Sequence, residues 1–241
     1  MIQIVVDTLN RLPELQQTLK SIWYRTTTPY TMHVIDDAST EGNQKWLVNM
    51  QRRGKIHGLT LRPARLGIPA NWNEAARTGD SEILVYTNGD VLCPLVEPDW
   101  LARGLAMLKK YPDLGMLSLN NPFCTAKHSW RIAEVRDGVT IVDRVPSFFL
   151  FVRRELMQKI ILPAIGEKIY RLPMTETYKG IDRMWSRGAQ ANGYVVGYLT
   201  RTYCKHIGYH SVRTDENFTK VGARVEPLNI ETLEPPEKYA G

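Results

Sequence analysis

Short apolar runs alternate with helix-patterned segments over the first 120 residues, and this alternation constrains the fold more than any other feature of the sequence. Five apolar runs have the length and composition of buried strands, at residues 2–6, 32–35, 59–61, 83–87 and 115–119. Between them, apolar side chains recur at helical spacing, in residues 12–23, 40–50, 69–77 and 99–108. This order predicts an α/β fold with a mostly parallel central sheet flanked by helices.

Local signals support these helix boundaries. Pro13 suits the first turn of the first helix, Ser39 or Thr40 can cap the second, and Asp99 can cap the fourth. The second half is less regular, and residues 120–147 show little periodicity. We expect a strand at residues 147–152, a helix at 154–161 and a loop at 163–180. A helix at 182–192, ended by Gly193, and a strand at 194–198 should follow.

The 241 residues carry a net charge of +6 that is unevenly distributed. Residues 1–120 have a net charge of +1, residues 121–224 of +8 and residues 225–241 of −3. We therefore predict one domain over residues 1–224, with halves at 1–120 and 121–224, and an acidic C-terminal tail over residues 225–241. A basic surface attracts the phosphates of nucleotides or nucleic acids, although a solvated face is an equally ordinary use of such charge.

Several classes of protein are excluded or disfavoured by what the sequence lacks. No apolar run approaches the ~18 residues that cross a bilayer, and the N-terminus has no signal-peptide pattern. The three cysteines have neither zinc nor CxxC spacing, so a cytoplasmic protein is expected. The motifs GxGxxG, GxxxxGK[ST], GxSxG and HExxH are absent, which argues against dehydrogenases, P-loop NTPases, α/β-hydrolases and zinc peptidases.

Polar residues follow each of the first four predicted strands. Ligands bind beyond the carboxyl ends of the strands in an open parallel sheet, so these loops should form one site. A carboxylate of Asp36 or Asp37 could accept the N3–H of a uracil ring or bind ribose hydroxyls, and Asp90 could hold Mg²⁺ or Mn²⁺ together with substrate phosphates. Each residue alone also has an ordinary explanation, because Asp and Asn-Gly are common at strand ends and turns.

Taken together, the loops resemble those of a family 2 glycosyltransferase of the GT-A (Rossmann-like) fold. Residues 5–11 resemble the opening strand with its Thr-x-Asn-Arg turn, and residues 34–40 resemble the Val-Asp-Asp-Gly-Ser uridine loop. Residues 67–75 resemble the Gly-x-x-x-Ala-Arg-Asn-x-Gly helix, with Ala75 at the last glycine position. Residues 83–90 resemble the strand that ends in Asp-x-Asp.

The resemblance extends into the second half and covers roughly residues 2–210. Asp182, followed by Gly193 and a tyrosine, resembles the acidic start of the acceptor-side helix. His206-x-Gly208 resembles the histidine motif that closes the donor site. Two positions depart from the family pattern: Asn88 replaces the first Asp of Asp-x-Asp, and Ile181 stands where many relatives have an acid.

The resemblance implies a role for each of these residues, with a nucleotide-sugar-binding half at 1–120 and a smaller acceptor-side lobe at 121–224. Asp182 would be the general base, favoured in its ionised form by the helix start, with Glu176 and Asp143 as alternatives. Asp90 and His206 would hold Mn²⁺ or Mg²⁺. The expected donor contacts are Thr8, Asn10, Asp36, Arg65, Gly67, Asn73, Asn88 and Gly89.

The implied function is inverting transfer of a sugar from a nucleotide sugar, expected to be a UDP-sugar, to a saccharide or other small hydroxyl acceptor, with no membrane partner. An alternative acceptor is a hydroxymethylated base of DNA, as for compact phage enzymes, in which case the protein acts in the host cytoplasm. The net +8 of residues 121–224 favours this alternative, and Trp130, Phe148 or Phe149 could stack on a displaced base. A domain that binds without turnover and a nucleotidyltransferase are two further alternatives.

Overall fold

A computed structural model describes residues 1–121, 131–158 and 181–208. The predicted loop at 163–180 and the predicted tail at 225–241 lie outside these ranges. Within the described residues, the main sheet has nine strands in the order β3-β2-β1-β4-β9-β6-β10-β8-β7, and a short second sheet pairs β11 with β5. The strands are β1 Ile2–Thr8, β2 Tyr30–Asp36, β3 Gly58–Leu61, β4 Ile83–Asn88, β5 Val91–Leu92, β6 Leu114–Asn120, β7 Ile132–Arg136, β8 Val139–Val142, β9 Phe149–Arg153, β10 Val195–Tyr203 and β11 Lys205–His206.

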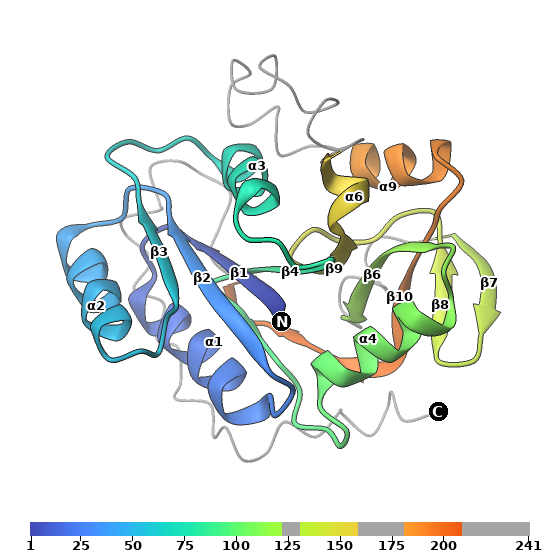
Figure 1. Ribbon diagram of the computed structural model, residues 1–241, viewed down its shortest axis with the longest axis horizontal. Helices are drawn as coiled ribbons and strands as arrows, with labels where there is room; N and C mark the ends of the chain where they lie inside the picture. The colour runs from blue at the N-terminus through green and yellow to red at the C-terminus, as the bar shows by residue number, and fades with distance from the viewer. Residues whose placement is uncertain (122–130, 159–180, 209–241) are drawn as a thin grey trace.

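Helices cover both faces of the main sheet, as the sequence predicted (Figure 1). The described helices are α1 Leu12–Arg25, α2 Glu41–Arg52, α3 Ile68–Arg77, α4 Trp100–Lys110, α6 Arg154–Leu156 and α9 Ile181–Ala191. Helices α1, α2 and α4 enclose one hydrophobic core, and α3, α6 and α9 enclose the other. Alternate residues of β1 divide between these cores, since Ile4 and Val6 face the first and Val5 the second. No described helix is both long and apolar enough to span a membrane.

The sheet is mixed, which corrects the expectation of a mostly parallel one. Strands β3, β2, β1 and β4 pair in parallel, as do β6 and β10. Strand β9 runs antiparallel between β4 and β6, and β8 and β7 are antiparallel to their neighbours. The direction of β9 could not be predicted from its sequence, because a strand buried on both faces has the same apolar pattern in either direction.

This topology brings distant segments to the carboxyl edge of the parallel strands. Because β9 is antiparallel to β4, its first residue, Phe149, pairs with Thr87 near the end of β4. Helix α9 precedes β10, which is parallel to β6, so the helix begins at that same edge. A contact confirms this placement: the amide of Ser147 donates to the Asp182 carboxylate at 3.1 Å.

Two strand pairs were not predicted. The β7–β8 hairpin lies within the region of weak periodicity. It was not predicted because four of the five β7 residues are exposed, so the strand shows no hydrophobic alternation. Its turn contains Gly138, which has a φ of 85°. The two-residue strands β5 and β11 are too short to produce a pattern. Their pairing sets His206 opposite Val91, beside Asp90.

Asp99 caps α4 as predicted, and its hydrogen bonds give a reason to expect that the stability of the fold depends on pH in acid. Its carboxylate accepts hydrogen bonds from the amides of Thr27, Thr28 and Ala102 at 2.7–2.9 Å. Burial raises the pKa of Asp99, but these donors outweigh burial and lower the pKa to about 2. Because the folded pKa lies below the unfolded value, the stabilisation is complete above about pH 4 and is lost as the pH falls toward 2.

We therefore expect Asp99→Ala to lower the free energy of unfolding by about 2 kcal/mol at neutral pH. The difference from the wild type should shrink between pH 4 and pH 2, as measured by urea unfolding. Glu41→Ala is a suitable control, since the Glu41 side chain is 80% exposed. A difference that stays constant over this range would contradict the role assigned to the Asp99 carboxylate.

Candidate active site

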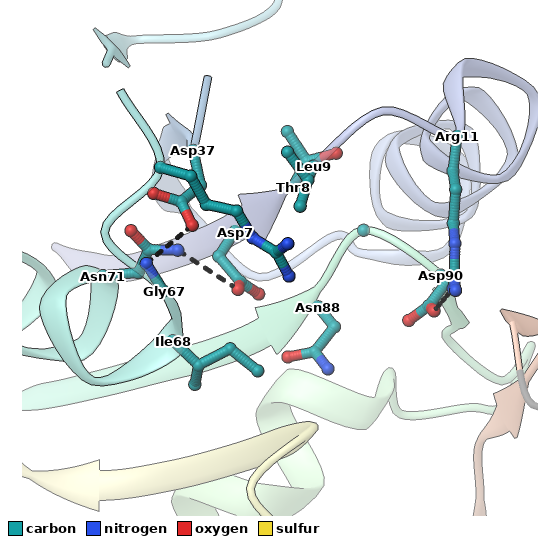
Figure 2. A pocket seen from close by; sticks show the side chains of 12 residues that line it. Asp7, Thr8, Leu9, Arg11, Asp37, Gly67, Ile68, Asn71, Asn88 and Asp90 are labelled. Carbon is teal, nitrogen blue, oxygen red and sulfur yellow. Dashed lines mark hydrogen bonds and ion pairs between the residues drawn. The ribbon is translucent and has the colours of Figure 1, made fainter. Parts of the chain in front are cut away.

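A polar pocket of about 110 Å³ opens at the carboxyl edge of β1 and β4 (Figure 2). It is formed by the last residues of β1 and β4, by the loops after β1, β2, β3 and β4, and by the start of α3. Five of the predicted donor contacts line it, together with Asp90 of the predicted metal site. The lining residues are Asp7, Thr8, Leu9, Arg11, Asp37, Arg65, Gly67, Ile68, Asn71, Asn88, Gly89 and Asp90.

The pairing of β1 with β4 aligns the pocket residues at the ends of these two strands. Asp7 pairs with Asn88, and the amide of Gly89 donates to the carbonyl of Asp7 at 2.8 Å. A Cβ on Gly89 would lie 3.1 Å from the Thr8 hydroxyl and from a Leu15 methyl. The turn after β4 therefore packs tightly against β1, and glycine suits it because no side chain has to fit there.

Asp37 shapes the opposite side of the pocket. Its two carboxylate oxygens accept hydrogen bonds from the amides of Leu66 and Gly67, each at 2.8 Å. Gly67 has a φ of 87°, which favours glycine, and it stands directly before α3. Asp37 thus joins the loop after β2 to the start of α3 and still faces the pocket.

Three predicted donor contacts, Asn10, Asp36 and Asn73, do not line the pocket. Asn10 joins two loops: its amide donates to the Ser39 hydroxyl at 2.7 Å, and its side-chain oxygen accepts from Thr40 at 2.9 Å. Asp36 is fully buried, and its Oδ1 accepts from the Ser39 amide at 2.9 Å. Asn73 is buried within α3. Their roles in donor binding stay predictions.

Asp7 and Asn71 line the pocket although sequence analysis assigned them no role. Asp7 is 7% exposed, and its Oδ2 lies 3.5 Å from the Asn71 amide nitrogen. Burial raises the pKa of Asp7 to about 7, and the charges of Asp90 and Asp37 also raise it, while hydrogen bonds from Tyr86 and Asn71 oppose the rise. The available signal was position, since Asp7 is the first polar side chain after a buried apolar run.

Asp90 lies at the other end of the pocket, between the guanidinium of Arg11 and the imidazole of His206. Its Oδ2 is 2.7 Å from Nη1 of Arg11, and its Oδ1 is 3.2 Å from Nε2 of His206. Burial raises the pKa of Asp90, but the charges and hydrogen bonds of His206 and Arg11 outweigh it and hold the pKa below its usual value. The sequence predicted that Asp90 and His206 meet; it did not predict the pairing with Arg11.

Phe148 links the pocket to Asp182. The preceding amide, of Ser147, donates to Asp182, while the carbonyl of Phe148 accepts from the amide of Asn88 at 3.1 Å. The Phe148 ring lies 5.0 Å from the ring of His206. Asp182 is therefore held next to the segment that borders Asn88 and His206, although it does not itself line the pocket.

A buried aromatic cluster fixes the helix that carries Asp182. The Trp72 ring of α3 lies 4.0 Å from the Tyr86 ring of β4 and 4.0 Å from the Trp185 ring of α9. Trp185 comes one helical turn after Asp182. Trp72 therefore contacts both β4 and α9, and the second core holds these two elements in place relative to each other.

Comparison with known proteins decides the family. The profile described as "Glycosyl transferase family 2" matches residues 3–161, which is more than half of the chain. The chain belongs to glycosyl transferase family 2. The family resemblance inferred from the loops is thereby confirmed. A search of curated proteins gives no match.

Solved structures show that this family 2 chain has the GT-A fold. The mannosyltransferase PcManGT from Pyrobaculum calidifontis, in complex with GDP-Man and Mn²⁺, superposes with a TM-score of 0.62 at 20% identity, over 87% of this chain and 57% of that chain. S. aureus TarS 1-349 in complex with UDP superposes with a TM-score of 0.60 at 16% identity, over 84% of this chain and 59% of that chain. GalNAc-T7 with UDP, GalNAc and Mn²⁺ superposes with a TM-score of 0.65 at 12% identity, over 86% of this chain and 43% of that chain. The chain spans only about half of these longer chains.

The residues around Asp90 bear on the divalent metal that the sequence predicted for this family 2 site. In the described part of the chain, no three His, Cys, Asp or Glu side chains gather into a group that could hold a metal ion. Both Asp90 oxygens already face nitrogens of Arg11 and His206, and Asn88 contributes no charge. The arrangement of these described side chains does not fit a divalent cation at Asp90, and the predicted metal binding by Asp90 and His206 is untested.

The structure bears differently on the alternative general bases and on the aromatic residues that were expected to stack on a displaced base. Asp143 is exposed, and its carboxylate accepts from the amide of Arg131 near the outer edge of the sheet. Glu176 and Trp130 lie outside the described residues. Phe149 is fully buried against Trp100, so the expectation that it could stack on a base is wrong. Phe148 is partly exposed and keeps that expectation open.

Proposed function

We propose that this protein transfers a sugar from a nucleotide sugar to an acceptor hydroxyl with inversion at the sugar carbon. The observation that carries the proposal is the link from Asp182, through Ser147 and Phe148, to the rim of the polar pocket. A nucleotide sugar bound in the pocket and an acceptor hydroxyl beside Asp182 would then meet at Phe148. In this proposal, residues 1–120 provide the donor side and residues 121–224 the acceptor side.

The proposed chemistry is a single displacement. The acceptor oxygen forms a bond to the anomeric carbon while the bond from that carbon to the diphosphate oxygen breaks. The acceptor proton passes to the Asp182 carboxylate, and the bonding electron pair leaves with the diphosphate. Asp182 is only partly exposed and stands in the first turn of α9, where the helix dipole favours its ionised form.

We propose a UDP-sugar as the donor. The pocket offers acceptors and donors suited to a uracil ring and its ribose, with the carboxylate of Asp37 and the guanidinium of Arg65 on one side. UDP accompanies TarS and GalNAc-T7, whereas PcManGT was solved with GDP-Man, so a guanine nucleotide is the natural comparison in any binding test.

We propose a saccharide or other small hydroxyl compound as the acceptor. Part of the basic excess of residues 121–224 has a structural use, which weakens the argument for DNA. Arg154 is 7% exposed and donates to backbone carbonyls, Arg153 donates to the carbonyls of Leu108 and Leu114, and Arg136 pairs with Asp113.

A panel of UDP-, GDP- and TDP-sugars, screened by thermal shift and then by transfer to monosaccharide and oligosaccharide acceptors, tests the function. We expect stabilisation and transfer with a UDP-sugar. Plain and hydroxymethylated DNA belong in the same assay, with binding measured at roughly 50 and 200 mM salt, where phosphate contacts have their largest effect. If no nucleotide sugar stabilises the protein, the proposed activity is wrong; transfer to hydroxymethylated DNA would replace the proposed acceptor.

Asp37→Asn is expected to weaken UDP binding by about 10- to 100-fold, the range for a hydrogen bond to a charged group. An amide nitrogen cannot accept from the Leu66 or Gly67 amide, so the change also loosens the loop that shapes the pocket. The measurement is calorimetric titration with UDP. Asp36→Asn is the matched control, since Asp36 does not line the pocket; a larger loss there would restore Asp36 as the base-binding carboxylate.

A further inference from the structure

Arg11 is held at the pocket by an unusual backbone conformation. Asn10 and Arg11 have φ values of 57° and 54°, in the left-handed region that residues other than glycine rarely adopt. Two hydrogen bonds fix Asn10 to Ser39 and Thr40, and the carbonyl of Arg11 accepts the amide of Leu15 at the start of α1. Strained residues persist where the surroundings determine them, often at functional sites, and here the strain directs the Arg11 side chain toward Asp90.

The pair of Arg11 and Asp90 is enclosed as well as positioned. Their side chains are 22% and 12% exposed, and both line the pocket. The backbone of Gly208 lies so close that an added Cβ would overlap the Asp90 carboxylate and the Arg11 guanidinium. The amide of Ile207 donates to the Asp90 carbonyl at 2.8 Å, which fastens this segment over the pair. A cation of the chain therefore occupies the place beside Asp90 that a divalent metal would need.

We propose that Arg11 supplies the positive charge that binds the donor diphosphate and stabilises it as it leaves, in place of a divalent cation. This inference rests on the proposed function. A guanidinium carries a permanent charge and five N–H donors in a planar fork, so one side chain can serve a carboxylate and a phosphate together. As the bond between the sugar and the diphosphate breaks, charge accumulates on the leaving oxygen, and a fixed cation beside it lowers the barrier.

Asp90 and Asn88 are consistent with this assignment. In this arrangement Asp90 orients Arg11 rather than ligating a metal, and it is the positioning residue of the pair. The amide of Asn88 stands where the family pattern has the first carboxylate of Asp-x-Asp, so this motif gives Asp90 no second carboxylate with which to share a divalent cation. A divalent ion at Asp90 would also be repelled by the guanidinium 2.7 Å away.

The test is calorimetric binding of UDP, GDP and inorganic diphosphate to the full chain, in excess EDTA and again in excess Mn²⁺. We expect the dissociation constant of whichever nucleotide binds to differ by no more than about threefold between excess EDTA and excess Mn²⁺. In EDTA, Arg11→Gln should weaken that binding by about 10- to 100-fold, the range for a charge-assisted hydrogen bond, and Arg11→Lys should weaken it less. Arg52→Gln removes the same charge from an exposed position in α2 and should change nothing.

Three outcomes would overturn the inference, and they are distinguishable. Binding that requires Mn²⁺ in the wild type would assign the charge to a metal at Asp90 and leave the proposed function intact. Wild-type affinity in a folded Arg11→Gln variant, checked by circular dichroism, would show that Arg11 does not contact the diphosphate. Failure of both nucleotides to bind under either condition would remove the proposed function and this inference with it.

Discussion

Asp182→Asn is expected to lower kcat by about 10²- to 10⁴-fold while UDP binding is unchanged, since a general base contributes a factor of this size. The side-chain oxygen of an asparagine can still accept the Ser147 amide, so the variant keeps the contact that fixes this position. What it loses is the ability to take the acceptor proton. The measurements are steady-state kinetics of sugar transfer and calorimetric titration with UDP.

The alternative acids provide the controls for this prediction. Asp143→Asn should retain near-normal kcat, because Asp143 is exposed and its carboxylate lies beside Arg131. Glu176→Gln tests the remaining alternative. If Asp182→Asn keeps its rate and one of the other variants loses it, the base has been assigned to the wrong carboxylate. A loss of UDP affinity in Asp182→Asn would instead indicate a structural role for Asp182.

Much of the donor half could be predicted because its elements are locally specified. Strands β1, β4 and β6 are nearly continuous buried runs, β2 is buried over most of its second half, and Asp99 marks the start of α4 with a cap that the structure retains. The acceptor half depends on tertiary pairing instead. The exposed β7 has no alternating pattern, and the direction of β9 is set by its neighbours β4 and β6.

The site was predictable to the level of loops, less so to the level of side chains. The sequence identifies the loops after β1, β2, β3 and β4, because ligands gather at the carboxyl edge of a sheet. It does not decide which of two adjacent carboxylates faces the pocket, and the structure places Asp37 there while Asp36 is buried. Likewise Asn71 lines the pocket and Asn73 does not. The pairing of Arg11 with Asp90 joins residues 79 positions apart, which no local pattern indicates.

Arg154→Met is expected to lower the free energy of unfolding by about 3–5 kcal/mol, because several buried neutral oxygens lose their donor and each such loss costs about 1–3 kcal/mol. The Arg154 side chain joins the end of α3 and the approach to β4 to the start of α6. It donates to the carbonyls of Ala76, Thr78 and Ser81 at 2.6–2.9 Å and to the Gln3 side chain at 2.5 Å. Methionine fills similar space but leaves these buried oxygens without a donor.

Urea unfolding at neutral pH measures the Arg154 effect, with Arg52→Met as the control because Arg52 is exposed at the end of α2. That control should change stability by no more than about 0.5 kcal/mol. Arg154 does not line the pocket, so UDP affinity should be unchanged at temperatures where Arg154→Met remains folded. A loss below about 1 kcal/mol would mean that water replaces the guanidinium at these carbonyls. A loss of UDP affinity in the folded variant would mean that Arg154, 151 positions from Gln3, also holds the pocket in shape through β1.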